Sequence, residues 1–159
     1  MPKAKGQTEK DLKDLPRWDL RDLFPGPQSK EFGDALQTIE AQSKAFATRY
    51  EGKIVKLTGA QLGEAIEAYE KIAALEARAK TYTELLRAVD NDKSGWAADV
   101  TERLRKASGQ LQFFPLEINA IREADLFEKV ASPKLAHYGS WIAKVRGQRE
   151  HQLSREAEN

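Results

Sequence analysis

Apolar residues recur at intervals of three or four through a long stretch in the middle of the chain, which is the spacing of one face of an α-helix. Thr58 and Gln61 precede the stretch in the arrangement of a capping box, so the sequence predicts a helix over about residues 59–90. Its predicted buried face consists of Leu62, Ile66, Tyr69, Ile72, Leu75, Ala79, Tyr82, Leu86 and Val89. The helix would be roughly 45 Å long, which is more than a compact domain of this size usually needs.

A second amphipathic stretch lies nearer the N-terminus. Ser29 is a suitable N-cap and Gly52 a suitable stop, and the apolar spacing between them predicts a helix over about residues 30–50. Ser43 fills the one gap in this spacing. The other residues of the predicted buried face are Phe32, Leu36, Ile39, Phe46 and Tyr50.

After the turn DNDKSG, the same spacing predicts a third long helix over about residues 96–121, in which Pro115 should produce a kink. A short helix is expected near residues 124–130, and Ser132–Pro133 should open another that runs to about Arg146. The third helix would bury Trp96, Val100, Leu104, Ala107, Leu111, Phe114, Ile118 and Ile121. No stretch of any length alternates as a strand does, so the predicted fold class is all-α, a bundle of long antiparallel helices.

The segment LPRWDLRDLFPGP, residues 15–27, is rich in apolar residues and lies ahead of the first long helix. We call this segment the knot, without implying a knotted chain. Asp19 is a suitable N-cap for a single turn, with Asp22 placed to reach back to it. Trp18 and Leu23 then form a hydrophobic-staple pair. Because one turn cannot stabilise itself, the knot should dock on the first helices, with Trp18 and Leu23 as its anchors.

The two ends of the chain are polar. Residues 1–14 mix lysine with acidic and small groups and are predicted to be disordered. Residues 15–153 should then form a helical N-terminal domain. Ser154 resembles an N-cap, so residues 154–159 should be the start of a helix that is cut short, and we expect the chain to come from something longer.

Composition excludes several classes of protein. The net charge is +1, so no overall field attracts nucleic acid or an anionic membrane. The chain has no cysteine, which rules out disulfides and thiol catalysis, and no apolar run reaches the ~20 residues of a membrane span. A soluble cytoplasmic protein is expected.

The sequence offers no self-sufficient catalytic or metal site. His137 and His151 do not stand in a His-Glu-x-x-His pattern, and no nucleophile elbow or phosphate loop occurs, so no residue is assigned to catalysis, metal or cofactor. DNDKSG opens like an EF-hand, but Thr101 stands where the loop needs glutamate, so a polar interhelical turn competes with a calcium loop. The polar tips of Tyr69 and Tyr82 leave open a role in lining a groove.

Several motifs appear in the order of a known family. LPRWDLRDLFPGP, FATRYEGKI, LGEAIEAYEKIAALEARAKTYTELLRAVDND, FFPLEINAI and HQLSREAE together resemble the N-terminal region of oligoendopeptidase F, a thimet-oligopeptidase-like zinc metallopeptidase. The similarity covers about residues 15–158. Pro115, Arg155 and the turn DNDKSG depart from the family pattern.

The resemblance implies a helical peptidase whose two halves enclose a channel for short peptides. Zinc would be held by a His-Glu-x-x-His helix and a downstream glutamate, and the glutamate of the motif would act as the general base. This chain has none of those residues, so its helices would form one wall or the lid of the channel.

The expected function is therefore that of an N-terminal segment present without its catalytic domain and inactive alone. Its partners would be that domain and, in the whole enzyme, zinc and short peptides; self-association is also expected, but nucleic acid and membrane are not. An excised segment should expose apolar stripes along its second and third helices. The alternative is a stand-alone helical protein–protein interaction module.

Overall fold

The structure is a computed structural model that describes residues 19–148. The expectations for residues 1–14, Trp18, His151 and residues 154–159 therefore lie outside the described residues. Its α-helices are α2 (Lys30–Tyr50), α3 (Gly59–Val89), α4 (Ser94–Gly109), α5 (Phe113–Ala120), α6 (Glu123–Lys129), α7 (Pro133–Ala136) and α8 (Gly139–Gly147). Two 3-10 turns, η1 (Ile54–Lys56) and η2 (Asn91–Lys93), complete the elements. The described residues contain no strand, and the predicted all-α class is confirmed.

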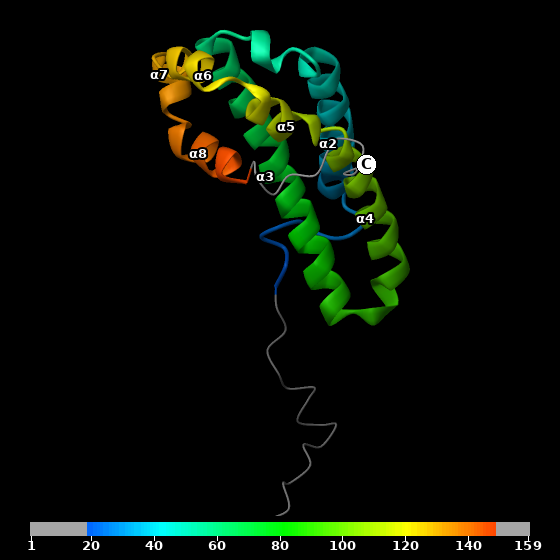
Figure 1. Cartoon of the computed structure of the whole chain (residues 1–159). Helices are drawn as coiled ribbons and strands as arrows, with labels where there is room; N and C mark the ends of the chain where they lie inside the picture. The colour runs from blue at the N-terminus through cyan, green and yellow to red at the C-terminus, as the bar shows by residue number, and fades with distance from the viewer. Residues whose placement is uncertain (1–18, 149–159) are drawn as a thin grey trace, which may run out of the picture.

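Each of the long helices α2, α3 and α4 runs antiparallel to the one before it in the sequence, and the three pack against one another (Figure 1). The short helices gather at the end of the molecule where α3 begins (Figure 1). There α6 and α7 contact α3, while α5 contacts η1 and α8. Among residues 19–148, none of the helices combines the length and the hydrophobicity that a transmembrane span requires.

The predicted caps of the first two long helices are confirmed. The Ser29 hydroxyl accepts a hydrogen bond of 3.2 Å from the Phe32 N–H, and α2 ends before Gly52, whose φ is +75°. At the start of α3, Thr58 and Gln61 exchange hydrogen bonds of 3.2 and 3.0 Å as a capping box. These caps satisfy N–H groups that have no partner within the helix, and they fix where each helix begins.

The predicted buried faces agree closely with the structure. Every residue predicted to face the core from α2 is buried, Ser43 included. On α3 the predicted face is buried or half-buried except at Val89, which is 59% exposed. All the predicted residues of the third helix from Val100 to Ile121 are buried, and Trp96 is half-buried.

The predicted kink at Pro115 is wrong. The helix ends at Gly109, a turn spans residues 110–112, and a new helix begins at Phe113. Pro115 then lies in the first turn of α5, where a residue has no intrahelical acceptor for its N–H. The chain thus accommodates the proline by starting a new helix two residues earlier, so that Pro115 falls in its first turn.

The single helix predicted from Pro133 to Arg146 is also wrong. The structure has a short α7 and a separate α8, with a turn at His137 and Tyr138 between them. Gly139 is the first residue of α8. Glycine favours the helix less than any residue except proline, which agrees with an interruption at this point.

The buried apolar residues form two clusters. The first core cluster lies where α2 ends and α3 begins, under the short helices, and includes Phe46, Tyr50, Ile54, Leu62, Ile66, Phe113, Phe114, Ile118 and Leu135. The second core cluster lies towards the other end of α3 and includes Phe24, Phe32, Leu36, Ile39, Tyr82, Val100 and Leu104. On α2, Ser43 falls between Ile39 of the second cluster and Phe46 of the first.

The Ser43 hydroxyl is fully buried and has no hydrogen-bond partner among the described residues. An unsatisfied buried hydroxyl costs about 1–3 kcal/mol. We therefore expect Ser43→Ala to raise the free energy of unfolding by about 1 kcal/mol, measured by urea denaturation. Thr83→Val is the matched control, because the buried Thr83 hydroxyl donates to the Ala79 carbonyl at 2.8 Å and its removal should not stabilise. A loss of stability in Ser43→Ala would contradict the prediction.

The described part of the knot forms one turn, and this turn docks on the long helices as expected. The N–H groups of Leu23 and Phe24 both donate to the Leu20 carbonyl. The Asp19 carboxylate accepts from the Arg21 N–H at 3.0 Å, so it caps the turn, and no bond from Asp22 is seen. The deepest anchor is Phe24, at 4% exposure, whereas Leu23 is only half-buried.

Candidate functional site

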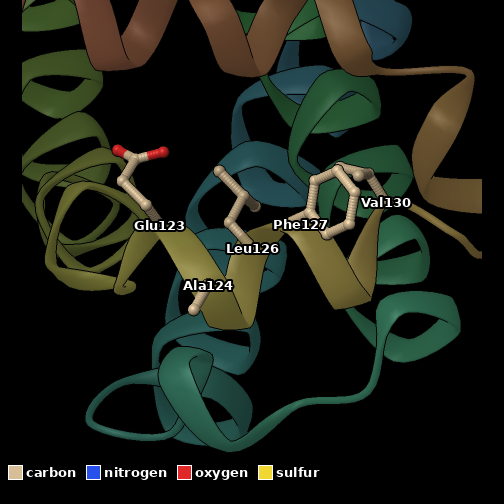
Figure 2. A pocket seen from close by; sticks show the side chains of 5 residues that line it. All are labelled: Glu123, Ala124, Leu126, Phe127 and Val130. Atoms are coloured by element: carbon tan, nitrogen blue, oxygen red, sulfur yellow. The ribbon is translucent and has the colours of Figure 1, made fainter.

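Phe127 is the most exposed large apolar side chain of the described residues, at 80%. It stands on α6 beside a hollow of about 490 Å³. Figure 2 shows the side chains that line this hollow, which we call the Phe127 face: Glu123, Ala124, Leu126, Phe127 and Val130. All five come from α6 and the residue that follows it (Figure 2).

The predicted exposed stripes along the second and third helices are not found in the described residues. Besides Phe127, the exposed large apolar side chains are Val55 and Val89, and only Val89 lies on α3. The neighbouring helices cover the rest of those faces, because the first core cluster packs against the beginning of α3 and the second against its other end. The exposed apolar surface therefore concentrates on α6.

The segment that carries the Phe127 face lies directly on the backbone of α3. A Cβ added to Gly59 would meet the Lys129 carbonyl oxygen at 2.1 Å, and one added to Gly63 would meet the Lys134 backbone at 3.0 Å. The Lys129 ammonium also donates to the Leu57 carbonyl. This contact was not predicted, although two glycines four residues apart on one helix face are a signal for close approach.

Two charged side chains fasten α5 to its neighbours. The Glu117 carboxylate accepts from the Gly52 N–H at 2.6 Å and from the Ile54 N–H at 3.2 Å. Arg146, with 11% of its side chain exposed, donates to the carbonyls of Ile118 at 3.1 Å and Ile121 at 3.0 Å. It also pairs with Glu123, so the end of α8 lies beside the Phe127 face. These charges serve the packing of the short helices.

A second, more polar hollow of about 220 Å³ lies where α4 gives way to α5. It is lined by Tyr69, Ala73, Glu76, Ser108, Leu111, Gln112 and Pro115. The Glu76 carboxylate accepts a hydrogen bond from the Ser108 hydroxyl. Burial, and then the charge of Glu76, raise the pKa of Tyr69 above its usual value, so the phenol stays neutral. Tyr69 thus lines a hollow, whereas Tyr82 is buried in the second core cluster.

The described residues hold no group of three acidic, histidine or cysteine side chains that could bind a metal ion. His137 is exposed and packs edge-on against Tyr138. A peptidase zinc ion does not fit this part of the chain, because such an ion needs three protein ligands around it.

The turn DNDKSG does not have the form of a calcium loop. The Asp90 carboxylate accepts from the Asp92 N–H at 3.1 Å, and Ser94 already begins α4. Thr101 donates its hydroxyl to the Ala97 carbonyl at 2.7 Å inside that helix. A helix cannot wrap its side chains around an ion as the twelve-residue loop does. Of the two alternatives, the structure supports the interhelical turn.

Comparison with known families bears on the segment that carries the Phe127 face. Residues 117–159 match the family Oligopeptidase F. The match confirms the predicted resemblance to an oligoendopeptidase F N-terminal region over about the last quarter of the chain. It begins at Glu117, the residue that ties α5 to the turn after α2. No curated protein and no solved structure matches the chain.

Proposed function

We propose that this chain is the N-terminal helical part of an oligoendopeptidase F-like zinc peptidase of the cytoplasm, which hydrolyses short peptides. Its helices would form a wall or lid of the peptide channel. The zinc ion and the groups that cleave the peptide would belong to a catalytic part with a His-Glu-x-x-His motif, which residues 1–159 do not contain. The observation that carries the proposal is the Oligopeptidase F match over residues 117–159. The all-α fold agrees with it.

The geometry supports the Phe127 face as the surface that meets the catalytic part. The face lies within the residues that match the family, and it is the exposed apolar part of a segment otherwise seated on α3. The Arg146–Glu123 pair also brings the end of α8 to the same place. A large exposed apolar group is typical of an interaction surface.

The test is complementation in trans. The chain is mixed with a separately produced oligopeptidase F catalytic part that carries His-Glu-x-x-His, and cleavage of a quenched fluorescent peptide is followed. We expect no cleavage and no retained zinc from this chain alone, and faster cleavage when both parts are present. Equal rates with and without this chain would contradict the proposal.

Phe127→Ser should weaken the association of the two parts by about tenfold or more, because burying such a ring is worth about 1.5–3 kcal/mol. Val89→Ser is the matched control, since Val89 is also exposed but lies at the far end of α3. Association is measured by titrating the catalytic part and reading the initial rate. Equal affinity for Phe127→Ser and the unaltered chain would remove the Phe127 face from the proposal.

A stand-alone helical interaction module is the second candidate function, and the exposure of Phe127 favours it too. In that case the Phe127 face would meet another copy or another protein. Sedimentation of the chain, read together with the complementation assay, separates the two. Self-association that Phe127→Ser abolishes, without any gain of peptidase activity in trans, would support the module.

A further inference from the structure

A groove of about 270 Å³ runs between α2 and α3, on elements other than the one that carries the Phe127 face. From α2 it is lined by Gln42, Ala45, Phe46, Arg49 and Tyr50, and from α3 by Ala68, Lys71 and Ile72. The largest buried groups of this lining are Phe46 and Tyr50, whose ring centroids lie 4.8 Å apart. The floor of the groove is therefore apolar and aromatic.

The charges along the groove all have one sign. Arg49 and Lys71 are the charged lining residues, one from each helix, and the lining includes no carboxylate. The Arg49 guanidinium lies 5.0 Å from the centroid of the Tyr50 ring and has no ion pair among the described residues. Each cation is exposed at the mouth, so an anionic group can reach it from solvent.

The nearest acidic competitor is Glu67. It pairs with Lys71 at 2.8 Å and also with Lys134 at 3.5 Å. Its hydrogen bond raises the pKa of Lys71, which therefore stays charged at neutral pH. An exposed pair of this kind is worth at most about 1 kcal/mol, so an incoming carboxylate can share Lys71 at little cost.

The volume fits one side chain better than a whole ligand. It falls just below the roughly 300–1,000 Å³ of small-molecule sites, so one large apolar side chain would fill it. Carboxylates on either side of that side chain would reach the cations on the two helices. A groove with an apolar floor and a cationic rim thus fits an apolar residue flanked by acidic ones.

We propose that the groove between α2 and α3 binds a peptide segment in which an apolar side chain stands between carboxylates. The apolar side chain packs on Phe46 and Tyr50, and the carboxylates contact Arg49 and Lys71. This proposal goes beyond the proposed role in a peptidase. Binding is measured on this chain alone, so a failure to bind the peptide would not contradict that role.

The test is fluorescence anisotropy with a labelled pentapeptide that has one phenylalanine between two pairs of glutamates. We expect saturable binding to the unaltered chain. A peptide with serine in the central place should bind at least tenfold more weakly, because the apolar contact is lost. A peptide with lysine in place of glutamate should not bind. Absence of binding by the first peptide at millimolar concentration, or equal binding of the serine peptide, would overturn the proposal.

Variants then locate the peptide. Arg49→Gln and Lys71→Gln should each weaken binding about two- to fivefold, as expected of exposed ion pairs. Lys44→Gln is the matched control, since Lys44 is an exposed cation of α2 outside the groove lining. Ala45→Trp should block binding by filling the groove without altering a charge. Equal losses in Lys44→Gln and Arg49→Gln, or full binding by Ala45→Trp, would mean that the peptide does not occupy the groove.

Discussion

Gly59→Ala should lower the free energy of unfolding by about 3 kcal/mol, at the upper end of the range for overpacked sites. The new Cβ would stand 2.1 Å from the Lys129 carbonyl oxygen and 2.9 Å from the Ser132 Cβ. The first of these is a backbone atom that cannot rotate away, so α3 would have to separate from the end of α6 and the residues after it. That separation would expose part of the first core cluster, which includes Leu126 and Leu135.

The measurement is urea denaturation followed by circular dichroism. Gly33→Ala is the matched control, because Gly33 also lies in a helix and an added Cβ meets nothing within 4 Å. That control should stabilise the chain by about 0.5–1 kcal/mol, the difference in helix propensity between alanine and glycine. If Gly59→Ala were as stable as Gly33→Ala, α6 would not be seated on α3 as the structure shows.

The features that the sequence predicted well are local ones. Ser29 with Phe32, and Thr58 with Gln61, interact over three residues, so the pattern of the chain already contains both partners. Every residue predicted to be buried on α2 is buried for the same reason, since helical spacing alone decides which side chains share a face; Ala35 is buried as well and was not predicted.

The features that it missed depend on partners far away in the chain. Lys129 and Leu57 are 72 positions apart, and Glu117 and Gly52 are 65 apart, so no local pattern joins them. Pro115 shows a different limit. The sequence predicted that Pro115 lies inside a long helix, whereas in the structure a new helix begins at Phe113 and Pro115 lies in its first turn. Helix boundaries respond to packing as well as to the local pattern.

For the candidate site, the sequence predicted the element but not its role. The helix near residues 124–130 was expected, and α6 confirms it. That Leu126 faces the core while Phe127 faces solvent follows from how α6 sits on α3, which the glycines of α3 decide. The apolar exposure expected along the long helices therefore lies on a short one.

Phe24→Ala should lower the free energy of unfolding by about 3 kcal/mol, the lower end of the range for buried phenylalanine, since a surface turn can partly collapse. The ring is 4% exposed and lies edge-on to Phe32 and Tyr82, with centroid distances of 5.0 and 5.3 Å. The Arg78 guanidinium covers it at 4.6 Å and donates to the Leu23 carbonyl. The ring thus holds α2 and α3 together at one end of the second core cluster.

Leu23→Ala is the matched control, because Leu23 belongs to the same turn but is only half-buried, and it should cost about 1 kcal/mol. Both values come from urea denaturation followed by circular dichroism, which reports on the long helices. The turn itself tolerates alanine equally at both positions. A difference between Phe24→Ala and Leu23→Ala therefore reports on how the turn docks on the helices, and not on whether the turn forms. Equal small losses, within about 0.5 kcal/mol, would mean that the knot does not clamp the bundle. A large loss confined to Phe24→Ala would show that the stability of the helices depends on the segment that precedes them.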